Sequence, residues 1–279
     1  MRLRLWHAPD GTRVAYREAG AGPGLVLLHS ALLTHREWEP VVEHLAHRFR
    51  LILPDLPLHG DSEAGPHHPY TLPWYAEVMS AFCEHAAGSR PLVGGHGMGA
   101  EILLHASTSG RLRPARLVLA PTRLHAAARP TGRQRAWRVT APLGRLPGVG
   151  RLVTHAARAA FTPDWGDRLS ARANPAARDL VRHAFADVGG DADLARAWAR
   201  HARGWPAGPE PELLDAYGAL ACPVLLLWAD ADEQHPLATA EEALARLPDG
   251  QLRILTGAGY LVAYDDPVGV ARELIAFCG

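Results

Sequence analysis

Lysine is absent from this 279-residue chain, so every basic side chain other than histidine is an arginine. Arginines and acidic residues number 29 each, which leaves no basic excess for binding nucleic acid or an anionic membrane surface. No window approaches the roughly 18 uninterrupted apolar residues of a membrane span, and the sequence does not open with a basic patch followed by an apolar segment. These absences predict a cytoplasmic protein without a nucleic-acid or membrane partner.

Cysteine is also scarce. Cys83, Cys222 and Cys278 lack metal-ligand spacing and cannot all pair, which is typical of a reducing compartment. Histidine is plentiful, at 16 residues, but no pair has the spacing of a dedicated zinc motif. We therefore expect no metal and no cofactor, and a site assembled from loop histidines such as His59 and His235 is kept only as a minor alternative.

The composition is that of a folded globular protein, with 48% apolar and 21% charged residues. The segments RLRLWHA and RVAYREA flank the turn Asp10-Gly11 and predict a β-hairpin. Short apolar runs then alternate with longer helical patterns, which indicates a parallel sheet covered on both faces. The expected strands are 24–30, 49–55, 90–95, 115–120, 222–230 and 251–255, and the expected helices 35–47, 71–87, 98–109, 238–247 and 267–278.

This alternation stops between 121 and 217, where a helical pattern rich in alanine and arginine is broken by prolines. The pattern predicts a core domain of residues 1–120 and 218–279 with a helical lid inserted at 121–217. Four tryptophans of the lid are candidates either to line an apolar ligand cavity or to hold the lid's own small core: Trp137, Trp165, Trp198 and Trp205.

The segment VGGHGMGAE (Val93 to Glu101) lies where a strand is expected to pass into a helix. In the nucleophile elbow G-x-S-x-G, small residues flank a serine on a strained turn between a strand and a helix. The middle position of this segment is Gly97, which offers no nucleophile.

Four further segments accompany the elbow, in this order along the chain: HSALLTHREW from His29, DLPLHGDS from Asp55, WADADEQHP from Trp228 and GAGYLVAYDDP from Gly257. Together with the elbow they resemble signatures of the α/β-hydrolase superfamily, in its lidded esterase, haloperoxidase and C–C hydrolase-like branch. Leu58 replaces a glycine of the family's D-x-P-G-x-G-x-S turn. The resemblance implies an α/β fold with a mostly parallel, doubly wound sheet of about eight strands and an inserted helical lid.

The resemblance also assigns the catalytic triad. Its acid falls on Asp232, while the nucleophile position holds Gly97 and the histidine position holds Tyr260. A serine hydrolase needs a hydroxyl nucleophile and an imidazole that takes its proton, and a phenol with an ordinary pKa near 10 is a poor base at neutral pH. The sequence therefore predicts a pseudo-hydrolase with a degenerate triad, unable to use the Ser-His-Asp mechanism.

Several groups are expected to remain at the site. The amide of Met98, with that of Ser30 or Ala31, would form an oxyanion hole, unless these amides only serve the strand and the helix cap. Gly97 is expected to enlarge the floor of the pocket, and His29 and His96 are expected beside it. Asp232 and Tyr260 should approach one another and serve either as a base and an acid or as a structural hydrogen bond.

Three functions stay open, and the sequence decides neither between them nor on the oligomeric state. The first is non-covalent acid/base or oxyanion-assisted chemistry, of lyase, isomerase, dehydratase or cyclase type, on a small apolar carbonyl compound. The second is silent binding of such a small molecule. The third is a hydrolase with a relocated nucleophile, Ser30, or a metal-bound water.

Overall fold

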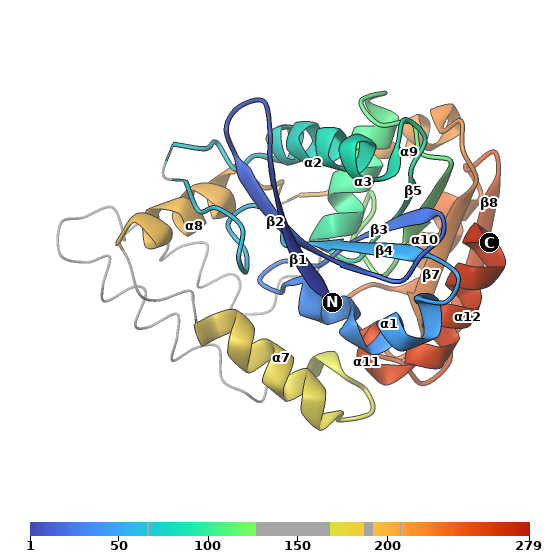
Figure 1. Ribbon diagram of the computed structural model, residues 1–279. Helices are drawn as coiled ribbons and strands as arrows, with labels where there is room; N and C mark the ends of the chain where they lie inside the picture. The colour runs from blue at the N-terminus through green and yellow to red at the C-terminus, as the bar shows by residue number, and fades with distance from the viewer. Residues whose placement is uncertain (66, 127–167, 187–191, 207) are drawn as a thin grey trace.

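A central eight-stranded sheet organises the computed structural model, which describes residues 1–65, 67–126, 168–186, 192–206 and 208–279 (Figure 1). Its strands are β1 (Arg2–His7), β2 (Arg13–Ala19), β3 (Gly24–Leu28), β4 (Arg50–Pro54), β5 (Leu92–Gly95), β6 (Arg116–Leu119), β7 (Val224–Ala229) and β8 (Gly250–Leu255). They lie in the order β1-β2-β4-β3-β5-β6-β7-β8. Strands β1 and β2 form the predicted antiparallel hairpin, β2 pairs antiparallel with β4, and every later pairing is parallel. The predicted α/β-hydrolase fold, with its mostly parallel sheet, is confirmed.

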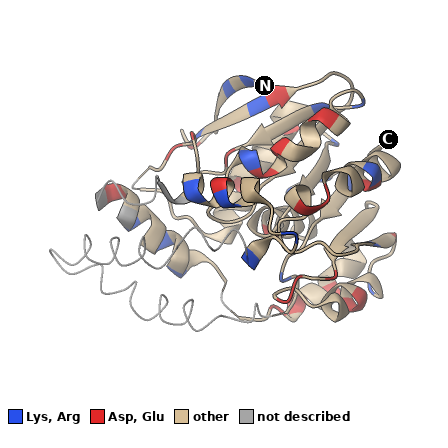
Figure 2. Cartoon of the chain, turned by 90° about the horizontal axis from the view of Figure 1, so that it is seen from below, with Lys and Arg blue, Asp and Glu red and all other residues tan. Residues whose placement is uncertain are grey.

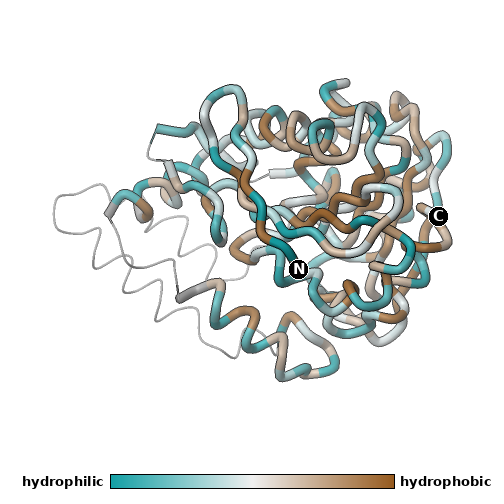
Figure 3. The backbone as a smooth tube through the Cα atoms, in the orientation of Figure 1, coloured by the Kyte–Doolittle hydropathy of each residue, from teal (hydrophilic) through white to brown (hydrophobic). Residues whose placement is uncertain are grey.

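Helices cover both faces of the sheet, because its strands carry apolar side chains on both sides. Along β3, Val26 and Leu28 join one apolar cluster, while Leu25 and Leu27 join the other. Figure 3 shows the resulting hydrophobic interior between the two helical layers. The helices of the first cluster include α2 (Leu72–Ala87), α3 (Met98–Thr108) and α10 (Leu237–Leu244), and those of the second α1 (Glu39–Leu45), α11 (Val262–Asp265) and α12 (Pro267–Cys278).

Two segments differ from what their sequence predicts. The predicted helix 35–47 is divided into a 3-10 turn, η1 (His35–Trp38), and α1, which carries Pro40 in its first turn, where a missing N–H costs no hydrogen bond. Leu58 has φ +76°, a conformation that glycine favours, and its N–H donates to the Glu63 carbonyl at 2.8 Å. The turn therefore keeps a glycine-like backbone although a leucine stands there.

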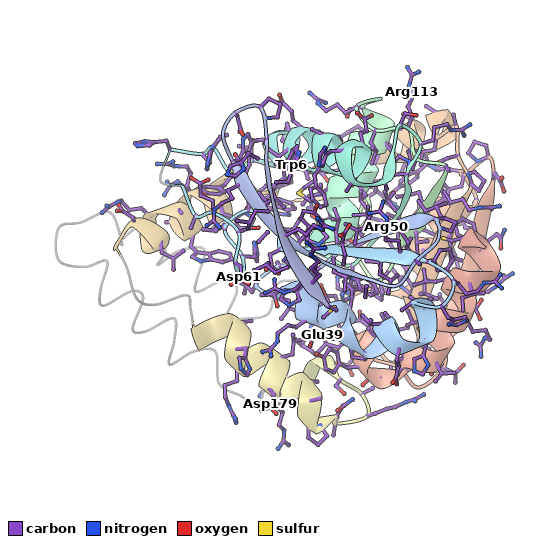
Figure 4. The ribbon with its side chains drawn as sticks, viewed as in Figure 1. Trp6, Glu39, Arg50, Asp61, Arg113 and Asp179 are labelled. Carbon is purple, nitrogen blue, oxygen red and sulfur yellow. The ribbon has the colours of Figure 1, made fainter. Side chains whose placement is uncertain are left out.

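Between β6 and β7 the described residues form α7 (Pro175–Ala186), α8 (Ala192–Gly204), α9 (Glu212–Ala216) and the 3-10 turn η3 (Tyr217–Ala219). Ala177, Leu180 and Ala184 of α7 pack with Leu33, Leu261 and Tyr264 in a small apolar cluster. Asp179, exposed on the same helix, points away from the sheet in Figure 4. Trp137 and Trp165 lie outside the described residues.

Charged residues of both signs are scattered over the helices and loops in Figure 2, in keeping with the zero net charge. Within the described ranges, no helix is both long and apolar enough to cross a membrane.

Candidate functional site

The turn between β5 and α3 presents Gly97 at the carboxyl end of the sheet. Gly97 has φ +49° and ψ −116°, a conformation that residues with a side chain adopt only under strain. Its N–H donates to the Pro121 carbonyl at 3.1 Å, and its carbonyl accepts the Thr122 hydroxyl at 3.1 Å. The segment directly after β6 and the helix α3 thus both stabilise this turn.

The side-chain space of Gly97 is occupied by Tyr260, from the loop after β8. A Cβ atom built on Gly97 would overlap the Tyr260 hydroxyl oxygen and lie 3.3 Å from Tyr260 Cζ and 2.8 Å from Ser30 Cβ. The expectation that Gly97 enlarges the pocket floor is therefore wrong, because the phenol of Tyr260 fills the vacated volume. The absence of a side chain at Gly97 and the position of the Tyr260 hydroxyl are therefore sterically linked.

A buried polar network continues from this hydroxyl. The Tyr260 hydroxyl hydrogen-bonds to the Ser30 side chain, and the Ser30 hydroxyl donates to Glu37 Oε1 at 3.3 Å. The same carboxylate accepts the Ser30 N–H at 2.6 Å and the Nδ1 of His96. Ser30, Glu37 and His96 are each only 1% exposed. Glu37 was not among the residues singled out from sequence, and only its place in HSALLTHREW could have drawn attention to it.

The order of these hydrogen bonds differs from the order that a relocated nucleophile at Ser30 would need. In a triad the imidazole contacts the hydroxyl, and the carboxylate contacts the imidazole. Here Glu37 lies between Ser30 and His96, so the imidazole does not receive the serine proton directly. Burial raises the pKa of Glu37, but the charge and the hydrogen bond of His96 outweigh it and leave this pKa below its usual value. An ionised Glu37 accepts hydrogen bonds and is a weak base.

The phenol ring of Tyr260 lies between two imidazoles. Its centroid is 4.2 Å from that of His96 and 5.1 Å from that of His235, whose ring is stacked on it at an interplanar angle of 20°. Burial raises the pKa of Tyr260 well above its usual value, and the charge of Glu37 raises it further, against a smaller opposing effect of the Ser30 hydrogen bond. Tyr260 is therefore a neutral phenol that can donate a proton or a hydrogen bond.

Asp232 lies in the loop after β7, with a hydrogen-bond pattern that differs from the expected one. Its Oδ2 binds His235 Nδ1 at 2.7 Å, and its Oδ1 accepts the Gln234 N–H at 2.8 Å. Burial raises the pKa of Asp232, but the hydrogen bond and charge of His235 lower it more, and the net shift is downward. The direct pairing of Asp232 with Tyr260 is thus replaced by His235, which contacts both. The D-x-x-H spacing of Asp232 and His235 is a sequence signal for this contact, whereas His235 was expected only in a minor metal site.

The amides expected to form an oxyanion hole are not equally free. The Ser30 N–H is taken by Glu37, so it is not available to a ligand and this expectation is wrong. Met98 is the first residue of α3, where helix N–H groups lack a partner within the helix, and Ala31 is exposed in the loop after β3. A hole formed by Met98 and Ala31 stays a prediction.

His29 is engaged by the backbone on both sides of its ring. Its Nδ1 donates to the Ser30 carbonyl at 2.8 Å, and its Nε2 accepts the Leu56 N–H at 2.9 Å. Through these hydrogen bonds, His29 connects the end of β3 with the loop after β4. Among the described residues, no group of three or more metal-binding side chains is arranged to hold an ion.

Of the four tryptophans expected in a lid, the two that lie among the described residues, Trp198 and Trp205, pack against the sheet domain. Trp198 of α8 contacts the His59 ring at a centroid distance of 4.9 Å, and Trp205 Nε1 donates to Glu101 Oε2 at 2.7 Å. Next to them, the ring centroid of His201 in α8 lies 6.4 Å from that of His59, and both rings are buried. Neither His59 Nε2 nor His201 Nδ1 has a hydrogen-bond partner within the described part of the chain. These contacts attach α8 to the sheet domain.

Acid should weaken the fold through these buried histidines. Burial lowers the pKa of His29, lowers that of His59 well below its usual value, and lowers that of His201 to about 4. In the unfolded chain the same groups bind protons near pH 6.5, so the unfolded state gains protons first as the pH falls. Each group that stays neutral in the fold should lower the free energy of unfolding by up to about 1.4 kcal/mol per pH unit below that point, down to its folded pKa.

Urea unfolding midpoints between pH 7.5 and pH 5 measure this effect. We expect the variant His201→Phe to reduce the pH dependence, while the exposed His47→Gln, a matched control, leaves it unchanged. The same pH dependence of the unfolding midpoint in the wild type, His201→Phe and His47→Gln would contradict the assignment of this effect to His201.

Comparisons with known proteins agree with this architecture. A family model described as "Alpha/beta hydrolase family" matches residues 25–273. An uncharacterised protein of Mycobacterium tuberculosis is 29% identical over 92% of this chain and 75% of its own length. A pimeloyl-[acyl-carrier protein] methyl ester esterase of Vibrio vulnificus is 26% identical over 96% of this chain and 99% of its own.

Solved structures show the same fold. An alpha/beta hydrolase fold protein from Burkholderia ambifaria has a TM-score of 0.80 at 23% identity, with 98% of this chain and 97% of that chain covered. The esterase EaEST from Exiguobacterium antarcticum has a TM-score of 0.79 at 16% identity, with 98% of each chain covered.

Proposed function

Since this chain belongs to the alpha/beta hydrolase family, we propose that its site performs non-covalent acid/base chemistry on a small apolar carbonyl compound instead of ester hydrolysis through a serine. The observation that carries the proposal is the Tyr260 hydroxyl in the side-chain space of Gly97. A proton donor thus stands where the family motif would hold a nucleophile.

Tyr260 suits this role as a hydrogen-bond donor, because its raised pKa keeps the phenol protonated and its hydroxyl hydrogen can rotate. In the free protein the hydroxyl binds Ser30, and with a ligand bound it would turn to donate to a carbonyl oxygen. A donor aimed at an oxygen that gains negative charge stabilises an enolate, with about 3 kcal/mol typical of one such contact. Lyases, isomerases, dehydratases and cyclases that act beside a carbonyl share this intermediate.

Hydrogen-deuterium exchange at the carbon next to a carbonyl tests the proposal without knowledge of the natural substrate. The protein is incubated in deuterated buffer with a panel of apolar ketones such as cyclohexanone, acetophenone and 2-tetralone, and deuterium uptake is followed by NMR. We expect catalysed exchange with at least one ketone, and a loss of about 100-fold in Tyr260→Phe, the size of one lost donor. Tyr16→Phe is the matched control, because Tyr16 lies in β2, packed against Phe82.

Two results would overturn the proposal. Exchange no faster than in buffer with every ketone would favour a protein that only binds its ligand. Cleavage of 4-nitrophenyl butyrate that is lost in Ser30→Ala would favour the relocated hydrolase, in line with the esterase names of several relatives.

A further inference from the structure

His235 has no place in the motifs that define the site, yet it is held there on three sides. Its Nδ1 binds Asp232, its ring face stacks on Tyr260, and its carbonyl accepts the Trp228 Nε1–H at 2.9 Å. Pro236 follows directly and restricts the backbone of His235. The side chain is 11% exposed, so it is largely but not completely enclosed.

The contact with Asp232 sets which ring nitrogen carries the proton. An ionised carboxylate can only accept hydrogen bonds, so His235 Nδ1 bears the hydrogen. In the neutral imidazole this leaves the lone pair on Nε2, the atom remote from Asp232. A carboxylate at Nδ1 also stabilises the imidazolium that forms when Nε2 takes up a proton.

Asp232 itself is badly placed to act as the base. One of its carboxylate oxygens accepts the Gln234 N–H and the other binds His235. Protonating either oxygen would remove the negative charge that strengthens both hydrogen bonds, whereas protonating His235 Nε2 would preserve that charge. Of the two groups, His235 is therefore better suited than Asp232 to accept a proton.

We infer that His235 is the general base of this site and that Asp232 is its positioning residue. The inference rests on the proposed function and adds a second group to it. His235 Nε2 takes a proton from the carbon beside the carbonyl, the electron pair of the broken C–H bond forms a C=C bond, and the π pair of the C=O bond moves onto the oxygen, which gives an enolate. The carbonyl oxygen takes the hydrogen bond or the proton of Tyr260. Reversal with a deuteron on Nε2 accounts for the exchange of hydrogen for deuterium.

Ketone exchange with His235 variants tests the inference. We expect His235→Gln to lose about 100-fold or more in rate, the lower range for a general base. Exchange by His235→Ala should recover in the presence of free imidazole, which a purely structural role of the side chain would not allow. Asp232→Asn should lose activity with little change in the half-saturating ketone concentration, and the exposed His47→Gln should behave as wild type.

The ring proton can be located without any substrate. Nitrogen-15 NMR of the imidazoles, assigned with His235→Gln, should show His235 protonated on Nδ1 at neutral pH and should show this preference lost in Asp232→Asn. A His235 protonated on Nε2, or a His235→Gln protein that exchanges ketone protons at the wild-type rate, overturns the inference while the proposed function stands. Absence of exchange in the wild type is a different result, since it removes the proposed function first.

Discussion

Replacing Gly97 by alanine is expected to lower the free energy of unfolding by about 2 to 6 kcal/mol. About 1 to 3 kcal/mol comes from the strained backbone conformation of Gly97, and a similar amount from overlap with the Tyr260 hydroxyl and with Ser30. Gly110→Ala separates the two contributions, because Gly110 has φ +72° but open space around its missing side chain. That control should lose only about 1 to 2 kcal/mol.

The overlap predicts a coupling between positions 97 and 260. In a Tyr260→Phe background the phenolic oxygen is gone, so Gly97→Ala should cost at least about 1 kcal/mol less than in the wild type. Urea denaturation of the four proteins of this double-mutant cycle measures the coupling. Equal costs of Gly97→Ala in both backgrounds would show that Tyr260 does not occupy the space in solution.

Glu37→Ala should be as damaging, at about 3 to 5 kcal/mol of unfolding free energy. The substitution leaves three donors at the centre of the site without an acceptor: the amide and the hydroxyl of Ser30 and Nδ1 of His96. Glu37→Gln keeps one acceptor oxygen in nearly the same shape and should cost about 1 to 2 kcal/mol.

Chemical denaturation of these variants measures the difference, with Glu43→Ala as control. Glu43 lies nearby on α1 with its side chain 80% exposed, so its loss should change the stability by less than about 0.5 kcal/mol. A Glu37→Ala protein as stable as Glu43→Ala would mean that water replaces the carboxylate and that the buried network is not intact in solution.

Several features of the fold could be predicted from the sequence because local patterns determine them. The β1–β2 hairpin followed from one turn dipeptide between two alternating segments, and the parallel strands from their apolar runs. The retained turn at Leu58 and the divided helix at Pro40 show where such patterns are least exact. At Leu58 a residue adopts a backbone conformation that it rarely takes, and the surrounding hydrogen bonds decide it, whereas Pro40 takes the place in a first helical turn that proline favours.

The site was predicted less well, since its hydrogen bonds join loops that are distant in the chain. Position alone identified Gly97, Asp232 and Tyr260. It could not reveal that Glu37 binds both Ser30 and His96, or that the Asp232 carboxylate faces His235 instead of Tyr260. Each of these partners depends on side-chain directions at the meeting point of several loops.

By itself the sequence determined the fold, because the fold follows from local pattern, and it predicted that Gly97 and Tyr260 stand where the family motifs place a serine and a histidine. Only the tertiary structure decided that Tyr260 fills the space beside Gly97 and that His235 binds the remaining acid. The physical reason is that a close-packed interior leaves no empty volume and few buried polar atoms without a partner. Which group fills a space or meets a charge is therefore settled by the packing of the whole chain.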